Sequence, residues 1–181
     1  YPQVFTDLTG SGINFGDFAD FKVAYSVVDG KNFGVPFDAG TVVTAFRTDY
    51  LEEAGLTVED FTGKTWAEWM ESGAKLSEAG YPAFSMTPEP DLIMMMLQSA
   101  GASLFDDSGN PTLTDNPVLL EAMNVYSDLV ESGQLLIVNE WDQYVASIVN
   151  GDVAGAMNGA WILASVQTAE DQSGKWVVTD M

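Results

Sequence analysis

Short strand-like runs alternate along this chain with longer helical patterns, and that alternation limits its fold more than any other feature. Four strand-like runs cover residues 41–46, 82–86, 153–157 and 175–179. Helical patterns cover residues 49–54, 65–79, 91–100, 117–132, 142–150 and 159–167. Four of these end just before Gly55, Gly80, Gly101 and Gly133, where glycine adopts the left-handed conformation without strain. Strands alternating with helices predict an α/β domain built in layers.

Two of the expected helices begin with recognisable caps. Thr65 and Glu68 have the spacing of a capping box. In this motif the threonine hydroxyl accepts from the backbone amide of the glutamate, and the glutamate carboxylate accepts from the backbone amide of the threonine. Asn116 caps the later helix, with Pro117 as its first residue. The first helix carries Trp66, Trp69, Gly73 and Leu76 on one face, so we expect both tryptophans to be core residues. The second carries Leu119, Met123, Tyr126 and Val130 on one stripe.

Two turns predict hairpins. Asp29-Gly30 joins the strand-like runs 24–28 and 32–36, and this dipeptide favours a tight hairpin turn. The acidic segment 106–110 resembles a calcium-binding loop, but the twelfth position from Asp106 is Pro117 where such a loop needs a glutamate. A turn within a hairpin over 104–113 is therefore the better interpretation.

The composition excludes several kinds of chemistry. The chain has 181 residues, with 27 acidic and 6 basic side chains and a formal net charge of −21. Such a charge is repelled by phosphate backbones, so we expect no nucleic-acid partner. Because histidine and cysteine are absent, Cys/His zinc sites, disulfides, thiol nucleophiles and Ser-His-Asp units are excluded. Carboxylates, hydroxyls, aromatic rings and the backbone are left.

Other sequence features carry little functional information. Paired carboxylates are the machinery of glycoside hydrolases, but 27 acidic residues make plausible pairs unavoidable, so we expect no enzyme. Gly10-Ser11-Gly12 lacks the context of a phosphate-binding loop. No apolar run reaches the roughly 18 residues of a membrane helix. Because the chain starts at Tyr1 and stops in a strand-like run, we expect it to be a piece of a longer protein.

Two tryptophans stand where α/β proteins place ligands. Trp141 lies at a helix start, and Trp161 follows a strand through the small residues Gly159 and Ala160. The carboxyl ends of strands are the usual ligand edge of an α/β sheet. An indole there can stack on the apolar face of a sugar ring while neighbouring carboxylates and amides bind its hydroxyls. Packing in the core is the competing interpretation, and the residues alone do not decide between the two.

An ordered series of motifs resembles one family. The series comprises residues 34–40 (GVPFDAG), 46–56 (FRTDYLEEAGL), 65–69 (TWAEW), 104–107 (LFDD), 141–144 (WDQY), 150–157 (NGDVAGAM), 158–161 (NGAW) and 173–176 (SGKW). It is similar to the extracellular sugar-binding proteins of ABC importers, of the maltodextrin-binding type (solute-binding protein family 1). The motifs cover most of the chain in the family's order.

The resemblance implies a periplasmic-binding-protein-like (type II) fold, with two α/β lobes that close on a ligand like a hinge. It implies that residues 1–41 end the first lobe's segment and include a crossover at about 36–41. Residues 42–181 would be the main segment of the second lobe, with a mixed sheet flanked by helices. The chain would then be an incomplete two-lobe protein that lacks the first strands, the last helices and an upstream secretion signal.

The resemblance also implies the site residues. Trp161 matches the family's aromatic platform, and Trp141 matches an aromatic contact at a helix start. Asp38 and Thr41 fall at the crossover, where polar groups face the cleft. Glu89 and Asp91 fall where maltodextrin binders place aromatic rings; because those rings are absent here, a long maltodextrin is a poor candidate ligand. No catalytic residue, metal or cofactor is expected.

The function implied is capture of a mono- or oligosaccharide between the lobes and delivery to the importer's permease subunits. The whole protein is expected to be monomeric and anchored by a lipid on the surface of a Gram-positive bacterium, with the periplasm as the alternative. A ligand of another class on the same fold, such as a polyamine or a peptide, is the first rival. A carboxylate-based glycoside hydrolase is the second.

Overall fold

The chain divides after Thr41 into two units, Tyr1–Thr41 and Val42–Met181. The computed structural model describes residues 3–38 and 40–181. Two residues used in the sequence analysis lie outside the described residues. They are Ala39, within the expected crossover, and Tyr1, from which we expected the chain to be a piece of a longer protein. The assignment of the units to two lobes of a larger protein stays a prediction.

The first unit contains a short helix and a tight hairpin. Its elements are a 3-10 helix at Phe15–Asp17, α1 (Asp20–Ala24), β1 (Val27–Val28) and β2 (Lys31–Asn32). Val27 pairs with Asn32, and Asp29 and Gly30 both have positive φ angles, of 51° and 73°, as a two-residue hairpin turn of type I′ requires. The predicted hairpin is confirmed, but its strands are shorter than expected because the first run begins inside α1.

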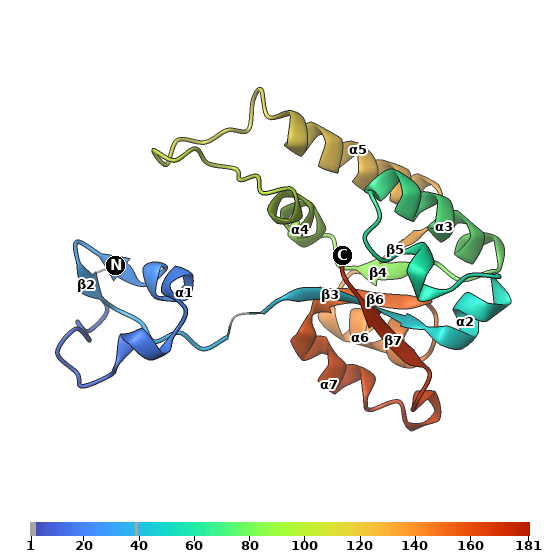
Figure 1. Ribbon diagram of the computed structural model, residues 1–181, viewed down its shortest axis with the longest axis horizontal. Helices are drawn as coiled ribbons and strands as arrows, with labels where there is room; N and C mark the ends of the chain where they lie inside the picture. Colours follow the sequence, from blue (N-terminus) through green and yellow to red (C-terminus); the bar gives the residue numbers. More distant parts are fainter. Residues whose placement is uncertain (1–2, 39) are drawn as a thin grey trace. The chain divides into compact units, whose positions relative to one another are not determined.

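The second unit is a five-stranded mixed sheet with helices on both faces, as the sequence predicted (Figure 1). Its strands are β3 (Val42–Arg47), β4 (Phe84–Met86), β5 (Leu135–Ile137), β6 (Gly155–Gly159) and β7 (Trp176–Thr179). Its α-helices are α2 (Thr48–Glu53), α3 (Trp66–Glu78), α4 (Asp91–Ser99), α5 (Pro117–Glu131), α6 (Trp141–Val149) and α7 (Leu163–Val166). Short 3-10 helices cover Val58–Asp60, Ala160–Ile162 and Glu170–Gln172. No helix in residues 3–38 and 40–181 is long and apolar enough to cross a membrane.

The strand order is β5-β4-β6-β3-β7. β4 is parallel to both β5 and β6, whereas β3 is antiparallel to β6 and to β7. Val42, the first residue of β3, therefore pairs with Gly159, the last residue of β6. The carboxyl ends of β4, β5 and β6 lie at one edge of the sheet, together with the amino end of β3.

The expected caps form. The side chain of Thr65 accepts from the amide of Glu68, whose carboxylate accepts from the amide of Thr65 at 3.0 Å. Asn116 Oδ1 accepts from the amide of Leu119 at 3.0 Å, with Pro117 as the first helical residue. Each cap satisfies amides that the first turn leaves without a helical partner.

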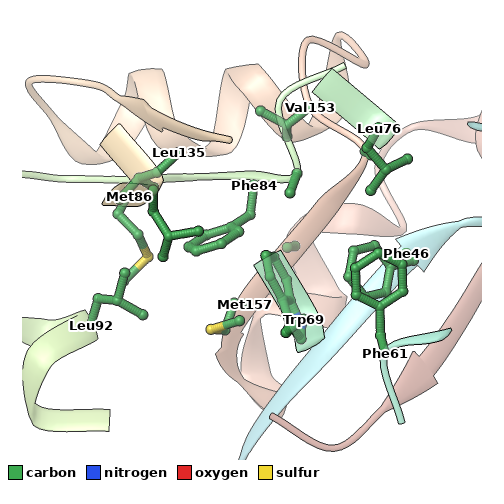
Figure 2. Packing of buried hydrophobic residues seen from close by; sticks show 14 of the residues in the cluster. Phe46, Phe61, Trp69, Leu76, Phe84, Met86, Leu92, Leu135, Val153 and Met157 are labelled. Carbon is green, nitrogen blue, oxygen red and sulfur yellow. The ribbon is translucent and has the colours of Figure 1, made fainter. Parts of the chain in front are cut away.

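Aromatic side chains from three elements and a loop make the centre of the core (Figure 2). Phe46 of β3 lies 4.3 Å from Phe61 between ring centroids, and Trp69 of α3 meets the ring of Phe61 edge-on at 5.2 Å. Trp69 also meets Phe84 of β4 edge-on at 5.5 Å. Edge-on contacts are favourable because the positive ring edge faces a negative ring face. The predicted core role of Trp69 is confirmed, and Trp66 packs half-buried against the same cluster.

Four of the sequence-based expectations differ from the structure. β5 was not predicted, because a run of three residues directly after Gly133 is too short to show a strand period. The run expected at 153–157 forms a strand two residues later, at Gly155–Gly159, and the short helix expected over 159–167 is a 3-10 turn followed by α7. The expected stripe on α5 was partly wrong. Tyr126 packs half-buried against the core, but the buried residues are Ala122, Val125 and Leu129, whereas Met123 and Val130 are exposed.

The same substitution should lower the free energy of unfolding by different amounts on the two faces of α5. Leu129 is fully buried and Leu120 is 62% exposed. We expect Leu129→Ala to lower the free energy of unfolding by about 2–5 kcal/mol, because it leaves a cavity. The matched change Leu120→Ala should cost about 0.5 kcal/mol or less. Urea unfolding of the two variants checks this, and equal losses would contradict the observed orientation of α5.

Candidate functional site

A hollow opens at the sheet edge where β4 and β6 end and α4 and α6 begin. Its volume is about 190 Å3. The lining residues are Met86, Thr87, Glu89, Asp91, Trp141, Tyr144 and Asn158. One aromatic wall thus faces several oxygen and nitrogen groups. This is the edge at which open α/β sheets bind ligands, because loops there leave the strand ends uncovered.

Four of the six expected ligand-binding residues lie in or beside this hollow. Glu89, Asp91 and Trp141 line it. Trp161 is not part of the lining, but its ring lies 5.3 Å from that of Trp141 between centroids, at an interplanar angle of 40°. The indoles of Trp141 and Trp161 are 45% and 48% exposed, so both present ring surface to solvent. We refer to these two residues as the tryptophan pair.

The other two expected residues belong to the first unit. Asp38 and Thr41 are both exposed there. Their expected part in ligand binding stays a prediction. Thr41 directly precedes β3, so the chain enters the second unit at the sheet edge that carries the hollow.

Sequence reasoning missed two polar residues of the hollow, Tyr144 and Asn158. Tyr144 is only 2% exposed, and its ring lies 5.0 Å from that of Trp141. Asn158 Nδ2 donates to the hydroxyl of Tyr144 at 3.2 Å, and Asn158 Oδ1 accepts from the amide of Gly159 at 2.8 Å. Two signals could have found them: Tyr144 stands one helical turn after Trp141, and Asn158 directly precedes the turn that carries Trp161.

The hydrogen bonds of Asn158 leave groups free for a ligand. A side-chain amide has two N–H donors and an oxygen that can accept twice. Within the described residues, one donor serves Tyr144 and one acceptor position serves Gly159. One donor and one acceptor position therefore remain on a side chain that lines the hollow. Its neighbour Tyr144 keeps the amide in a defined orientation.

The lining carries negative charge without a compensating cation. Glu89 and Asp91 are exposed carboxylates, and among the described residues no lysine or arginine lines the hollow. Three cations pair elsewhere: Arg47 and Lys175 lie 2.6 Å and 3.6 Å from the carboxylate of Asp49, and Lys31 lies 3.3 Å from Asp7. The Arg47 hydrogen bond holds the pKa of Asp49 below its usual value. The hollow therefore suits neutral hydroxyl donors or cations better than anions.

A larger hollow, of about 510 Å3, lies beside the start of α5. It is lined by Leu113, Asp115, Asn116, Pro117, Leu119, Leu120 and Met123. In the described part of the chain it offers aliphatic surface but no aromatic ring. It exceeds the hollow beside α4 and α6 in volume, as does a hollow of about 550 Å3 in the first unit. Convergent polar groups beside an exposed aromatic surface are, however, the better mark of a binding site.

The acidic turn at residues 106–110 satisfies its own aspartate. Asp106 Oδ1 accepts from the amides of Ser108 and Asn110 at 2.9 Å and 2.8 Å, and Phe105 bridges to Pro111 across the turn. The bonds from Asn110 and its neighbours lower the pKa of Asp106. The predicted hairpin turn is confirmed. Within residues 3–38 and 40–181, no group of three or more carboxylates is placed to hold a metal ion.

The whole chain matches one family model. The model describes bacterial extracellular solute-binding proteins and covers residues 1–181. The chain therefore belongs to the bacterial extracellular solute-binding protein family, which confirms the resemblance drawn from the motifs. Members of this family bind solutes and are not enzymes, so the glycoside hydrolase alternative is set aside.

Individual relatives agree with this assignment. The lactose-binding protein of Rhizobium radiobacter is 33% identical over 181 residues, which span 99% of this chain and 43% of that protein. A solved binding protein associated with an ABC transporter of B. animalis subsp. lactis, in complex with β-1,6-galactobiose, has a TM-score of 0.84 at 22% identity. That match covers 98% of this chain and 45% of the other.

The GacH receptor of Streptomyces glaucescens has a TM-score of 0.82 at 22% identity, over 98% of this chain and 47% of its own. At such identities the likeness establishes the fold, and the predicted periplasmic-binding-protein-like architecture is confirmed. The chain spans under half the length of each of these three relatives.

The buried hydroxyl of Tyr144 should make stability depend on alkaline pH. Burial raises the pKa of Tyr144 to about 12 from an ordinary 10.0, although the bond from Asn158 opposes the rise. Between these values an unfolded chain loses the tyrosine proton while the folded chain keeps it. The free energy of unfolding should therefore fall as pH rises through this range.

Replacing Tyr144 by phenylalanine should remove the contribution of this hydroxyl to the decrease in the free energy of unfolding with pH. Urea unfolding of the wild type and of Tyr144→Phe, at a series of pH values across this range, measures the difference. Parallel losses of stability in the two proteins would mean that the hydroxyl ionises in the folded chain and is not buried.

Proposed function

We propose that this chain is part of the substrate-binding component of a carbohydrate ABC importer, and that its second unit supplies one wall of the sugar-binding cleft. The tryptophan pair is the observation that carries the proposal. Two indoles in contact, each about half exposed, stand beside a hollow lined by polar groups. A soluble protein exposes such an aromatic surface where a ligand covers it.

The chemistry of the hollow suits a sugar. The flat C–H face of a pyranose ring stacks on indole, whose ring face is negative and attracts the weakly positive hydrogens. Each carboxylate of Glu89 and Asp91 can accept two hydroxyl hydrogen bonds, and bonds to a charged acceptor are the stronger kind. Asn158 adds one donor and one acceptor position beside them. None of these interactions requires a metal, a cofactor or a nucleophile.

The size of the hollow agrees with one wall of a cleft rather than a whole site. Its volume of about 190 Å3 is below the roughly 300–1,000 Å3 of pockets that enclose a drug-sized ligand. The relatives with sugars in their names or titles are more than twice as long as the part this chain matches. Asp38 and Thr41, at the proposed crossover, would add contacts when the lobes close.

The finer parts of the proposal go beyond the family assignment. The closed, loaded protein would dock on the permease subunits of the importer. The whole protein would work as a monomer held at the outer surface of a Gram-positive bacterium by a lipid, or free in a periplasm. A polyamine is the competing ligand, because Glu89 and Asp91 attract cations and no lysine or arginine is among the described lining residues.

A screen of sugars against polyamines on the whole protein tests the ligand class. Lactose, β-1,6-galactobiose and maltose should raise the melting temperature, whereas spermidine and putrescine should not. Binding of the native state alone raises the free energy of unfolding, so the shift reports affinity. A response to polyamines and to none of the sugars would replace the proposed ligand by a cation.

Trp161→Ala should strongly reduce the response to sugars. Loss of a central tryptophan from an interface typically costs about 2 kcal/mol or more, which is roughly a 30-fold loss of affinity. Phe105→Ala is the control, because Phe105 is 56% exposed but lies in the hairpin over 104–113, outside the hollow. An unchanged response in Trp161→Ala would remove Trp161 from the site.

The 181-residue chain alone should bind sugars weakly, because the proposed contacts of the other lobe are missing. Isothermal titration calorimetry with the same three sugars should give dissociation constants well above the micromolar range. An affinity of about 1 µM, or roughly −8 kcal/mol, would mean that this chain forms a complete site and would contradict the proposed half-cleft.

A further inference from the structure

Gly159, the last residue of β6, is a glycine that its backbone conformation does not require. Its φ and ψ are −55° and 147°, which any L-residue adopts. It is buried and pairs with Val42 at the start of β3. The reason for a glycine here must therefore lie in the space around its α-carbon.

That space is filled by the ring of Trp161. A β-carbon placed on Gly159 would lie 2.7 Å from Cδ1 and 3.3 Å from Cε2 of this indole, and still closer to its Nε1. These ring atoms are its three nearest neighbours. Carbon atoms prefer separations of about 3.5–4.0 Å. The indole therefore rests directly on the glycine, in a place that a methyl group would take.

The backbone around Gly159 is anchored, so the strand end cannot move aside for a methyl group. The Gly159 amide donates to Asn158 Oδ1 at 2.8 Å, and Asn158 in turn donates to the buried hydroxyl of Tyr144 at 3.2 Å. β3 holds the other side through the Val42 pair. Trp161 is 48% exposed, so its side chain can rotate into solvent. The ring, and not the strand, is the part that would yield.

We propose that Gly159 is a positioning residue that holds the indole of Trp161 against Trp141 and so forms the aromatic surface of the site. The two ring centroids lie 5.3 Å apart, and a displaced Trp161 would lose this contact. The effect on ligand binding rests on the proposed sugar-binding function. The effect on the tryptophan pair does not, and it can be measured without a ligand.

Gly155 provides a contrasting glycine on the same strand. A β-carbon there would lie 2.9 Å and 3.0 Å from the carbonyl oxygens of Ala83 and Ala45, and 2.8 Å from the ring of Phe46. Two of these neighbours are backbone atoms of adjoining segments and cannot rotate away. Gly155→Ala should therefore lower the urea midpoint of unfolding, whereas Gly159→Ala should leave it near that of the wild type.

Circular dichroism tests the position of the ring. Two indoles in contact give an exciton couplet, and the contribution of the tryptophan pair is the part of the spectrum that Trp161→Phe removes. Gly159→Ala should remove the same part. The contact between Trp66 and Trp69, at 5.6 Å, gives a second couplet that should persist in every variant and serves as an internal reference. A couplet from Trp141 and Trp161 that survives in Gly159→Ala would overturn the proposal.

A double-mutant cycle tests the consequence for binding. With the whole protein and lactose as the probe, Gly159→Ala should weaken binding about tenfold or more, as loss of a central aromatic contact does. In a Trp161→Ala background the same substitution should change the affinity less than about twofold, because the ring that it displaces is absent. Equal weakening in both backgrounds would show that Gly159 acts through something other than Trp161 and would overturn the proposal.

The two measurements separate the possible failures. If the wild type binds none of the three sugars, the proposed function fails, and the couplet alone decides the role of Gly159. If lactose binds and the couplet stays in Gly159→Ala, the positioning role fails while the function stands. Loss of the couplet together with non-additive binding supports both.

Discussion

The antiparallel pairing of β3 with β6 is the constraint on which the rest of the second unit depends. Five consecutive register pairs, from Val42↔Gly159 to Phe46↔Gly155, join a strand near the start of this unit to one near its end. The pairing places Phe46 over the core, where it meets Phe61 and Trp69. It also sets the amino end of β3 beside the carboxyl end of β6. The edge that carries the hollow is thus defined by backbone hydrogen bonds deep in the sheet.

The two end residues of β6 are glycines for opposite reasons. At Gly155 two neighbouring segments, β3 and the residues just before β4, approach so closely that there is no room for a side chain, and the result is a dense core. At Gly159 the missing side chain makes room for an indole that stays half exposed. Apolar ring surface left in water costs stability of roughly 25 cal/mol per Å2 relative to burial. A fold that keeps two such rings at one strand end forgoes that stabilisation, which is reasonable where a ligand covers them.

Much of this unit could be predicted from the sequence, and the failures have physical reasons. The capping box at Thr65 and the proline start of α5 were confirmed because they depend on neighbours in the chain alone. The buried face of α5 was missed because apolar residues surround most of that helix, so periodicity could not select Leu129 over Met123. Among the candidate site residues, the places of Trp141 and Trp161 at element ends drew attention to them, and the family resemblance then predicted their role. Tyr144 and Asn158 were not, because their roles arise only when α6 folds against the end of β6.

The contact between Trp141 and Trp161 has a thermodynamic consequence for recognition. Each ring already rests against neighbouring groups, Trp141 against Trp161, and Trp161 against both Trp141 and Gly159, so part of the loss of side-chain rotational freedom occurs during folding. A ligand with a flat face then binds to side chains that are already ordered. This lowers the free-energy cost of association by up to about 0.5–1.5 kcal/mol per side chain. Order of this kind sharpens discrimination by shape, because a ring that must give up a contact in order to turn follows the contour of a poorly matched partner only at a cost in free energy.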